Sequence, residues 1–137
     1  MGEPPQPARR LARLKLAASG DVVRARQAVM REMKSRRASA LRMTRFATAV
    51  SEIARNAVVH GGGGEISVSI TADEQYLVVR CQDHGPGIGN LEQAMQDGYT
   101  SRDGLGRGLG GAKRLSDTFD IRSAPGEGTV VTMSCRV

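Results

Sequence analysis

Two polar residues one helical turn apart form the first group in the sequence that could do chemistry. Glu52 and Asn56 lie in a long segment with apolar residues at helical spacing. Four residues place them about 40° apart around a helix and about 6 Å apart along its axis. A carboxylate and an amide oxygen side by side suit Mg²⁺, which prefers oxygen ligands. The carboxylate could instead orient or deprotonate a nucleophile, and a solvated helix face with a side-chain hydrogen bond is the plainer alternative.

The second group follows a strand-like run and combines a carboxylate with two glycines. Asp83, Gly85 and Gly87 belong to the segment Asp-His-Gly-Pro-Gly. A carboxylate at the end of a strand can accept a hydrogen bond from an exocyclic amine such as that of adenine. Glycines let a flat base lie against the backbone where a Cβ would clash. The alternative is a tight turn in which the aspartate caps the backbone.

The third group is a glycine-rich loop before a predicted helix. Residues 104–111 read Gly-Leu-Gly-Arg-Gly-Leu-Gly-Gly. Backbone amides in such a loop form an anion site together with the helix that follows, and Lys113 and Arg114 add positive charge in its first turns. The loop lacks the Gly-Lys-Ser/Thr ending of a Walker A motif. It does not follow a strand within a βαβ unit, so a dinucleotide fingerprint is not expected. A flexible linker is the alternative.

Composition narrows the classes of function. The 137 residues fit one domain, and the net charge is +6 with only 3% aromatic residues. The positive charge concentrates in residues 9–13 and 24–45, without interleaved aromatics for stacking on bases. No apolar stretch approaches the roughly 20 residues that span a membrane. We therefore expect no nucleic-acid or membrane binding, and solvated helix faces or a surface for an acidic partner instead.

The histidines and cysteines do not predict a metal centre. His60 is the last residue of a predicted helix, where it would interact with the helix dipole, and His84 lies within a turn. Cys81 and Cys135 each lie in an apolar strand-like run, and no secretory signal precedes them. We expect two buried free thiols in a reducing cytoplasm.

The elements that must position these groups follow an α+β order. Strands are expected at residues 13–18, 65–72, 76–82, 119–123 and 129–137, and helices at residues 22–34, 40–60, 91–96 and 109–116, with Asp21 capping the first helix. We expect a two-layer sandwich, in which helices cover one face of a mixed, mostly antiparallel sheet. Residues 1–12 contain three prolines and are expected to form a disordered basic leader, followed by one domain over residues 13–137.

Together, the three groups resemble the GHKL ATPase superfamily from about residue 18 to residue 137. Within it, residues 49–56, 97–101 and 104–117 resemble the RsbT-type switch serine/threonine kinases of the anti-sigma regulatory factor family. The resemblance implies the Bergerat fold, ATP and Mg²⁺ as cofactors, Glu52 as general base, Asn56 as the Mg²⁺ ligand and residues 98–107 as the ATP lid. The nucleotide-binding residues that it implies are Asn56, Asp83, Gly85, Gly87, Gly104, Gly106, Gly108, Leu109, Gly110, Lys113 and Thr129.

The resemblance also implies action on a second protein. It implies phosphorylation of a STAS-domain partner of the RsbS and RsbR kind in bacterial stress signalling, followed by activation of an RsbU-type phosphatase. We expect neither a phosphoacceptor-histidine domain nor a transducer domain in 137 residues. Two alternatives stay open: an ATP-dependent anti-sigma factor that sequesters a sigma factor, and a nucleotide-binding switch with negligible catalysis. Homodimerisation is also left open.

Overall fold

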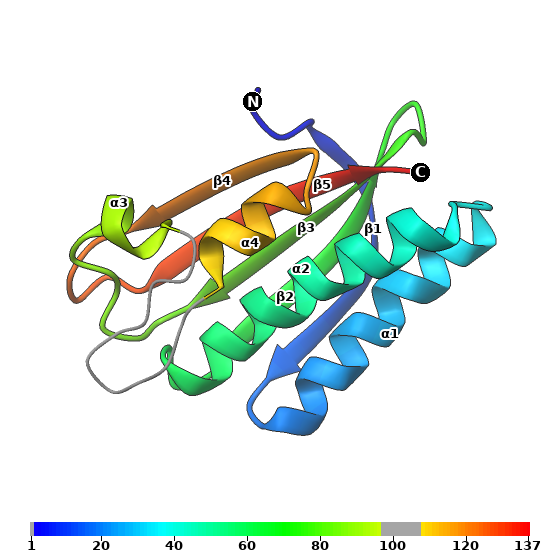
Figure 1. Cartoon of the computed structure of the whole chain (residues 1–137). Helices are drawn as coiled ribbons and strands as arrows, with labels where there is room; N and C mark the ends of the chain where they lie inside the picture. Colours follow the sequence, from blue (N-terminus) through cyan, green and yellow to red (C-terminus); the bar gives the residue numbers. More distant parts are fainter. Residues whose placement is uncertain (1, 97–107) are drawn as a thin grey trace.

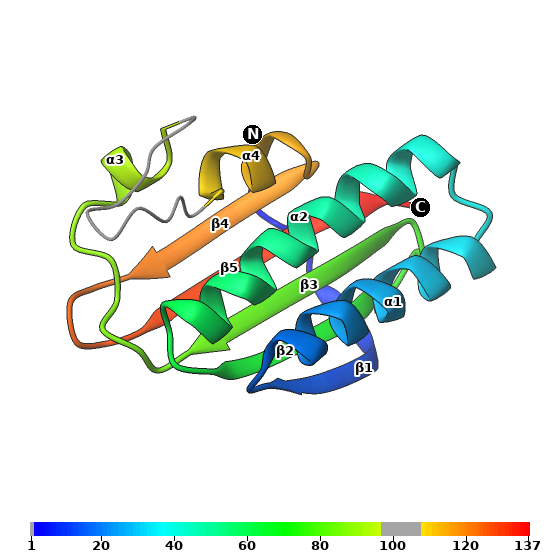
Figure 2. The same ribbon diagram turned by 60° about the horizontal axis from the view of Figure 1, so that its bottom comes forward.

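The structure is a computed structural model, and it describes residues 2–96 and 108–137. The chain forms, in order, β1 (Pro7–Leu16), α1 (Ser19–Ser35), α2 (Ala40–Val59), β2 (Gly64–Thr71), β3 (Tyr76–Asp83), α3 (Leu91–Ala94), α4 (Leu109–Arg114), β4 (Thr118–Ser123) and β5 (Thr129–Arg136). The strands pair in the order β1-β2-β3-β5-β4, and all four pairings are antiparallel. Helices α1, α2 and α4 lie on one face of this sheet (Figures 1 and 2), which confirms the predicted α+β two-layer sandwich.

One hydrophobic core fills the space between the helices and the sheet. The apolar face of α1, formed by Val22, Ala25, Val29 and Met33, is buried, and β2 buries every second side chain from residue 66 to residue 70. The largest fully buried side chains include Leu16, Met33, Phe46, Ile66, Ile70, Leu77, Leu109 and Met133. Leu109 is the first residue of α4, so the core holds the start of this helix in place. None of the described helices combines the length and apolarity needed to cross a bilayer.

The first strand begins earlier than the sequence predicts. Residues 7–12, expected in a disordered leader, belong to β1 and pair with β2 through shifted registers near Arg9 and Ala12. The prediction is therefore wrong for these residues. Pairing with β2 satisfies their backbone groups, and this support comes from a segment more than fifty residues away that local composition does not reveal.

The first helix also begins earlier than predicted, at Ser19. Asp21 is not its N-cap residue but lies inside the first turn and is 7% exposed. Its Oδ2 accepts hydrogen bonds from the backbone N–H groups of Ala17 at 2.8 Å and Ala18 at 3.0 Å. The carboxylate thus reaches back to the residues before the helix and joins the end of β1 to the start of α1.

Candidate functional site

Helix α2 carries Glu52 and Asn56 on the side that faces α4 and the end of β3. A Cβ on Gly108, the N-cap residue of α4, would collide with the Glu52 carboxylate, with Cδ only 3.0 Å away. Asn56 lines the same small cavity as Asp83. Glu52 is about one-third exposed, and its Oε1 accepts a hydrogen bond from Arg55 Nη1 at 3.0 Å. The tertiary structure therefore brings the first sequence group against the other two.

Asp83 ends β3 and lies among residues that have no side chain. Its Oδ1 accepts a hydrogen bond from the backbone N–H of Gly85 at 2.9 Å, so the aspartate-capped turn considered from the sequence is present. A Cβ on Gly61 would lie 2.6 Å from Asp83 Cβ and 2.7 Å from Oδ2. A Cβ on Gly64 would lie 3.0 Å from Asp83 Cα, and one on Gly128 would lie 3.1 Å from the Asp83 carbonyl carbon. We call Gly61, Gly64, Gly85 and Gly128 the glycine cradle.

The glycine cradle changes the interpretation of the second sequence group. A Cβ on Gly85 would lie 2.5 Å from Gly61 Cα, and one on Gly87 would lie 2.8 Å from the Ala124 carbonyl carbon. Both glycines are therefore required by this chain's own backbone. Sequence reasoning missed Gly61, Gly64 and Gly128. For Gly61 and Gly64 the available signal was the run of four glycines at residues 61–64, which is longer than the end of a helix needs.

A small cavity joins α2, α4 and the strand ends. It is lined by Ile53, Asn56, Ala57, Cys81, Asp83, Ile88, Leu109, Thr129 and Val131. Apolar walls with a few convergent polar groups are typical of small-molecule sites. The cavity measures about 20 Å³, which is room for about one water molecule. A nucleobase can enter only if the surrounding side chains move apart.

The hairpin β4–β5 supports Asp83 from the other side. Thr129 lies opposite Asp83 in the pairing of β3 with β5, and its Oγ1 is 2.8 Å from Ser123 Oγ. The Ser123 hydroxyl donates to the carbonyl of Gly128 at 2.8 Å and accepts from the backbone N–H of Ile88 at 2.8 Å. Because a serine hydroxyl has one proton to donate, Thr129 must be the donor to Ser123. Sequence reasoning missed Ser123, which connects the hairpin to the loop after Asp83.

The two cysteines are free and buried, as predicted. Burial is the main cause that raises the pKa of Cys81, which lines the cavity, to about 12, and the negative charge of Asp83 adds to it. Burial likewise raises the pKa of Cys135 to about 11, with a further contribution from Asp117. Both thiols therefore stay protonated at neutral pH and are poor nucleophiles there.

The third sequence group is described only in part. Gly108 has φ of 63°, Gly110 is buried in α4, and Lys113 is exposed in the last turn of this helix, which ends at Arg114 instead of residue 116. Gly104, Gly106 and the whole predicted lid at residues 98–107 lie outside the described residues. In the described part of the chain, no group of three or more His, Cys, Asp or Glu side chains could hold a metal ion.

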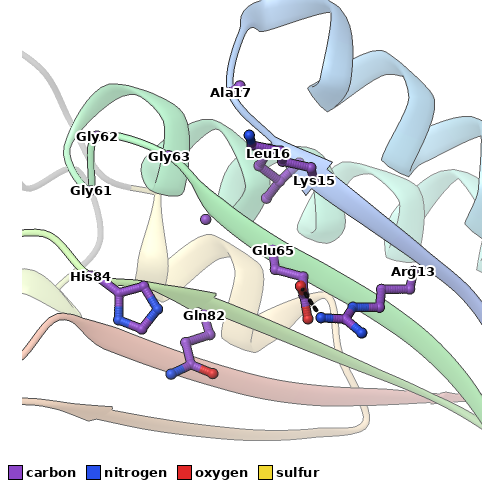
Figure 3. A pocket seen from close by; sticks show the side chains of 11 residues that line it. Arg13, Lys15, Leu16, Ala17, Gly61, Gly62, Gly63, Glu65, Gln82 and His84 are labelled. Carbon is purple, nitrogen blue, oxygen red and sulfur yellow. Dashed lines mark hydrogen bonds and ion pairs between the residues drawn. The ribbon is translucent and has the colours of Figure 1, made fainter.

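A larger cleft of about 860 Å³ borders the glycine run at residues 61–64 (Figure 3). Its polar walls come from β1, β2 and the end of β3. Between β1 and β2, Arg13 Nη2 donates a hydrogen bond to Glu65 Oε2 at 2.6 Å. This hydrogen bond lowers the pKa of Glu65 and raises that of Arg13. None of the predicted nucleotide-binding residues lines the cleft, but it shares Gly61 and Gly64 with the glycine cradle around Asp83.

Comparison with known proteins agrees with this geometry. Residues 16–135 match the family described as the histidine kinase-like ATPase domain. The chain is 39% identical over 113 residues to the serine/threonine-protein kinase RsbT of Bacillus subtilis, which covers 81% of this chain and 85% of that protein. It is 36% identical over 99 residues to an anti-sigma F factor of Pasteuria penetrans, covering 66% of each chain.

A solved structure has the same fold. The RsbU and RsbW domains of a Mycobacterium tuberculosis protein superpose with a TM-score of 0.63 at 19% identity. This match covers 92% of this chain and 32% of that one. The extent of the family match and the identity to RsbT show that this chain belongs to the histidine kinase-like ATPase domain family, the ATP-binding domain of the GHKL superfamily.

Proposed function

We propose that this chain is an ATP-dependent protein serine/threonine kinase that phosphorylates a separate regulatory protein. The observation that carries the proposal is the meeting of three distant segments. Asn56, Asp83 and Thr129 line one cavity. Next to this cavity, the Glu52 carboxylate lies against Gly108. The identity to a serine/threonine-protein kinase over most of both chains supports the same activity.

Each group has a role that fits its chemistry. Asp83 would accept a hydrogen bond from the adenine amine, with Thr129 supporting it from the neighbouring strand. Asn56 would hold Mg²⁺, which proteins usually bind through one or two side-chain oxygens together with substrate phosphates. Backbone amides around Gly108 and Gly110 would approach the phosphates closely because no Cβ intervenes. Gly104, Gly106 and Lys113 are assigned to the same task from the sequence.

Glu52 would act as the general base. Its carboxylate accepts the proton of a serine or threonine hydroxyl of the partner as that oxygen bonds to the γ-phosphorus and the bond to the ADP oxygen breaks. The side chain is 35% exposed, so a hydroxyl from outside can reach it. Arg55, at 3.0 Å, orients the carboxylate.

The proposed partner is a STAS-domain protein of the RsbS or RsbR kind in a bacterial partner-switching pathway, with activation of an RsbU-type phosphatase as the later step. The chain itself would act in the cytoplasm. The similarity to RsbT supports this assignment over an anti-sigma factor, because the anti-sigma F relative matches a shorter part of the chain at lower identity.

Phosphate transfer tests the proposal directly. We would incubate the protein with Mg²⁺, radiolabelled ATP and the STAS protein, and compare it with Glu52→Gln, Asn56→Ala and a control, Glu74→Gln. Glu74 is an exposed carboxylate in the hairpin between β2 and β3. We expect phosphate on a serine or threonine of the partner, at least 100-fold slower transfer with Glu52→Gln, and unchanged transfer with the control.

Two results would contradict the proposal. Transfer at the wild-type rate by Glu52→Gln would show that Glu52 is not the general base. Transfer at the wild-type rate by Asn56→Ala would show that Asn56 is not a required Mg²⁺ ligand. If the protein binds a sigma factor only in the presence of ATP and transfers no phosphate to the STAS protein, the anti-sigma function is the correct one.

A further inference from the structure

A separate pocket lies at the C-terminal end of α4, whereas Glu52 lies against the N-terminal end of this helix. It has a volume of about 270 Å³ and lies between the start of α2, the end of α4 with the three residues after it, and β5. We call it the Leu41 pocket. It is lined by Leu41, Arg42, Arg45, Arg114, Leu115, Ser116, Asp117 and Cys135. Apart from Arg114, which the sequence analysis associates with the anion site of the glycine-rich loop, none of these residues has a role in the proposed phosphate transfer.

The rim of the pocket carries an exposed apolar side chain. Leu41 lies in the first turn of α2 and is 68% exposed, the highest exposure of any large hydrophobic residue in the described part of the chain. Leu115, which packs against the core, continues this apolar surface into the pocket. A single exposed leucine is ordinary, but here it stands among cationic side chains beside a hollow.

Two exposed arginines, Arg42 and Arg45, supply positive charge at this pocket. Across residues 2–96 and 108–137, no carboxylate forms an ion pair with Arg42 or Arg45. Arg45 Nη2 donates only a long hydrogen bond of 3.5 Å to the carbonyl of Arg114. The carboxylate in the pocket, Asp117, accepts a hydrogen bond from the backbone N–H of Arg136 at 2.7 Å, and its single negative charge is outnumbered by the two arginines.

Both arginines also act on the floor of the pocket. Burial and the charge of Asp117 raise the pKa of the Cys135 thiol, and the charges of Arg42 and Arg45 partly oppose this rise. The two guanidinium groups therefore act on the interior of the hollow as well as standing at its exposed rim. An anionic group placed there would meet both of them.

We propose that the Leu41 pocket docks an acidic segment of a protein partner, with carboxylates on Arg42 and Arg45 and an apolar side chain against Leu41. Guanidinium groups bind carboxylates through two parallel hydrogen bonds, and arginine is enriched among the residues that dominate protein–protein affinity. Nucleic acid fits less well, because aromatic residues for base stacking make up only 3% of the sequence.

The position of the pocket gives such docking a use. Arg45 precedes Glu52 by seven residues, about 10 Å along α2. A partner held by its acidic segment would keep a neighbouring hydroxyl within reach of Glu52. This use rests on the proposed kinase function, whereas the binding itself does not.

Fluorescence anisotropy at 0.15 M salt can measure the binding with two labelled probes. One probe is a twelve-residue peptide of Glu-Leu-Asp repeats, and the other is a single-stranded oligothymidine of twelve nucleotides. The pocket variants are Arg42→Glu with Arg45→Glu, and Leu41→Ser. The control is Arg26→Glu with Arg31→Glu, which makes the same charge change at exposed positions of α1.

We expect the peptide to bind at least tenfold more weakly to the pocket double variant, about threefold more weakly to Leu41→Ser, and within threefold of wild type to the control. Equal losses in the two double variants would overturn the proposal, because they indicate unspecific attraction to net charge. Tighter binding of the oligothymidine than of the peptide would also overturn it, in favour of a nucleic-acid surface.

A fluorescent ATP analogue separates this outcome from the kinase proposal. All variants should bind it as the wild type does, which shows that they are folded. If peptide binding depends on the pocket but the protein transfers no phosphate, the docking proposal is supported and the kinase proposal is refuted. If the pocket variants bind the peptide as the wild type does and the protein is an active kinase, only the docking proposal is refuted.

Discussion

Gly61→Ala tests the glycine cradle, because it adds one methyl group directly against Asp83. The new Cβ would lie 2.6 Å from Asp83 Cβ and 2.7 Å from Oδ2. Carbon atoms pack at about 3.5–4.0 Å, so the carboxylate must move by about 1 Å. The backbone of Asp83 is held by Gly64 and Gly128, which lie against its main chain, so the carboxylate itself has to move.

The structure sets the size of the expected effects. Overpacking of this kind costs about 1–3 kcal/mol of stability. A hydrogen bond to a charged group contributes about 1.5–3 kcal/mol. If Asp83 holds the adenine amine, its displacement should weaken ATP binding by about 10- to 100-fold, since 1.4 kcal/mol is a factor of ten.

A neighbouring glycine provides the matched control. Gly62 has φ of 70° and open space around its Cα. Gly62→Ala should therefore cost about 1–2 kcal/mol of stability from backbone strain while leaving ATP affinity unchanged. Urea unfolding measures stability, and titration calorimetry measures the affinity for ATP.

A double variant completes the test. If the two side chains collide, Asp83→Ala should restore part of the stability that Gly61→Ala removes, and the two effects on stability should not add. Wild-type ATP affinity in folded Gly61→Ala would refute the role of Asp83 in the nucleotide site. An equal loss of affinity in Gly62→Ala would refute the steric argument.

Three further predictions follow from the described contacts. Gly108→Ala, at φ of 63° and against the Glu52 carboxylate, should slow phosphate transfer at least tenfold, with about 1–2 kcal/mol lost in urea unfolding. Asp21→Ala leaves two backbone N–H groups without their acceptor and should cost about 2–3 kcal/mol in the same measurement. The unfolded Cys81 thiol ionises above pH 9.0, whereas the folded one keeps its proton to about pH 12, so stability should fall as pH rises across this window. Cys81→Ala should make this fall shallower by about 1 kcal/mol per pH unit.

Each of these predictions has an outcome that contradicts it. Undiminished transfer by Gly108→Ala would mean that α4 does not constrain Glu52. A loss below about 0.5 kcal/mol in Asp21→Ala would show that its two hydrogen bonds to Ala17 and Ala18 contribute no more than a surface interaction. Identical slopes of stability against pH for wild type and Cys81→Ala would show that the thiol is not buried in the folded state.

Local patterns in the sequence were sufficient for most elements and for the composition of the site. Helical spacing of apolar residues predicted α1 and α2, and alternation predicted β2 and β3, because these periods are properties of a single segment. The order of Glu52 and Asn56, then Asp83, then the glycine-rich loop indicated one superfamily and one ligand. The leader at residues 7–12 was mispredicted because its partner β2 is distant in sequence.

Only the tertiary structure decided how close these parts come to one another. It showed that Gly61, Gly64 and Gly128 leave room for Asp83, and that Gly108 lies on Glu52. It also left Leu41 exposed and packed residues 114–117 and Cys135 against the start of α2, which forms the pocket beside Arg42 and Arg45. The physical reason is that the residues of a segment set its own composition and periodicity. How closely its side chains fit, and which charges surround them, depends on the distant segments that pack against it.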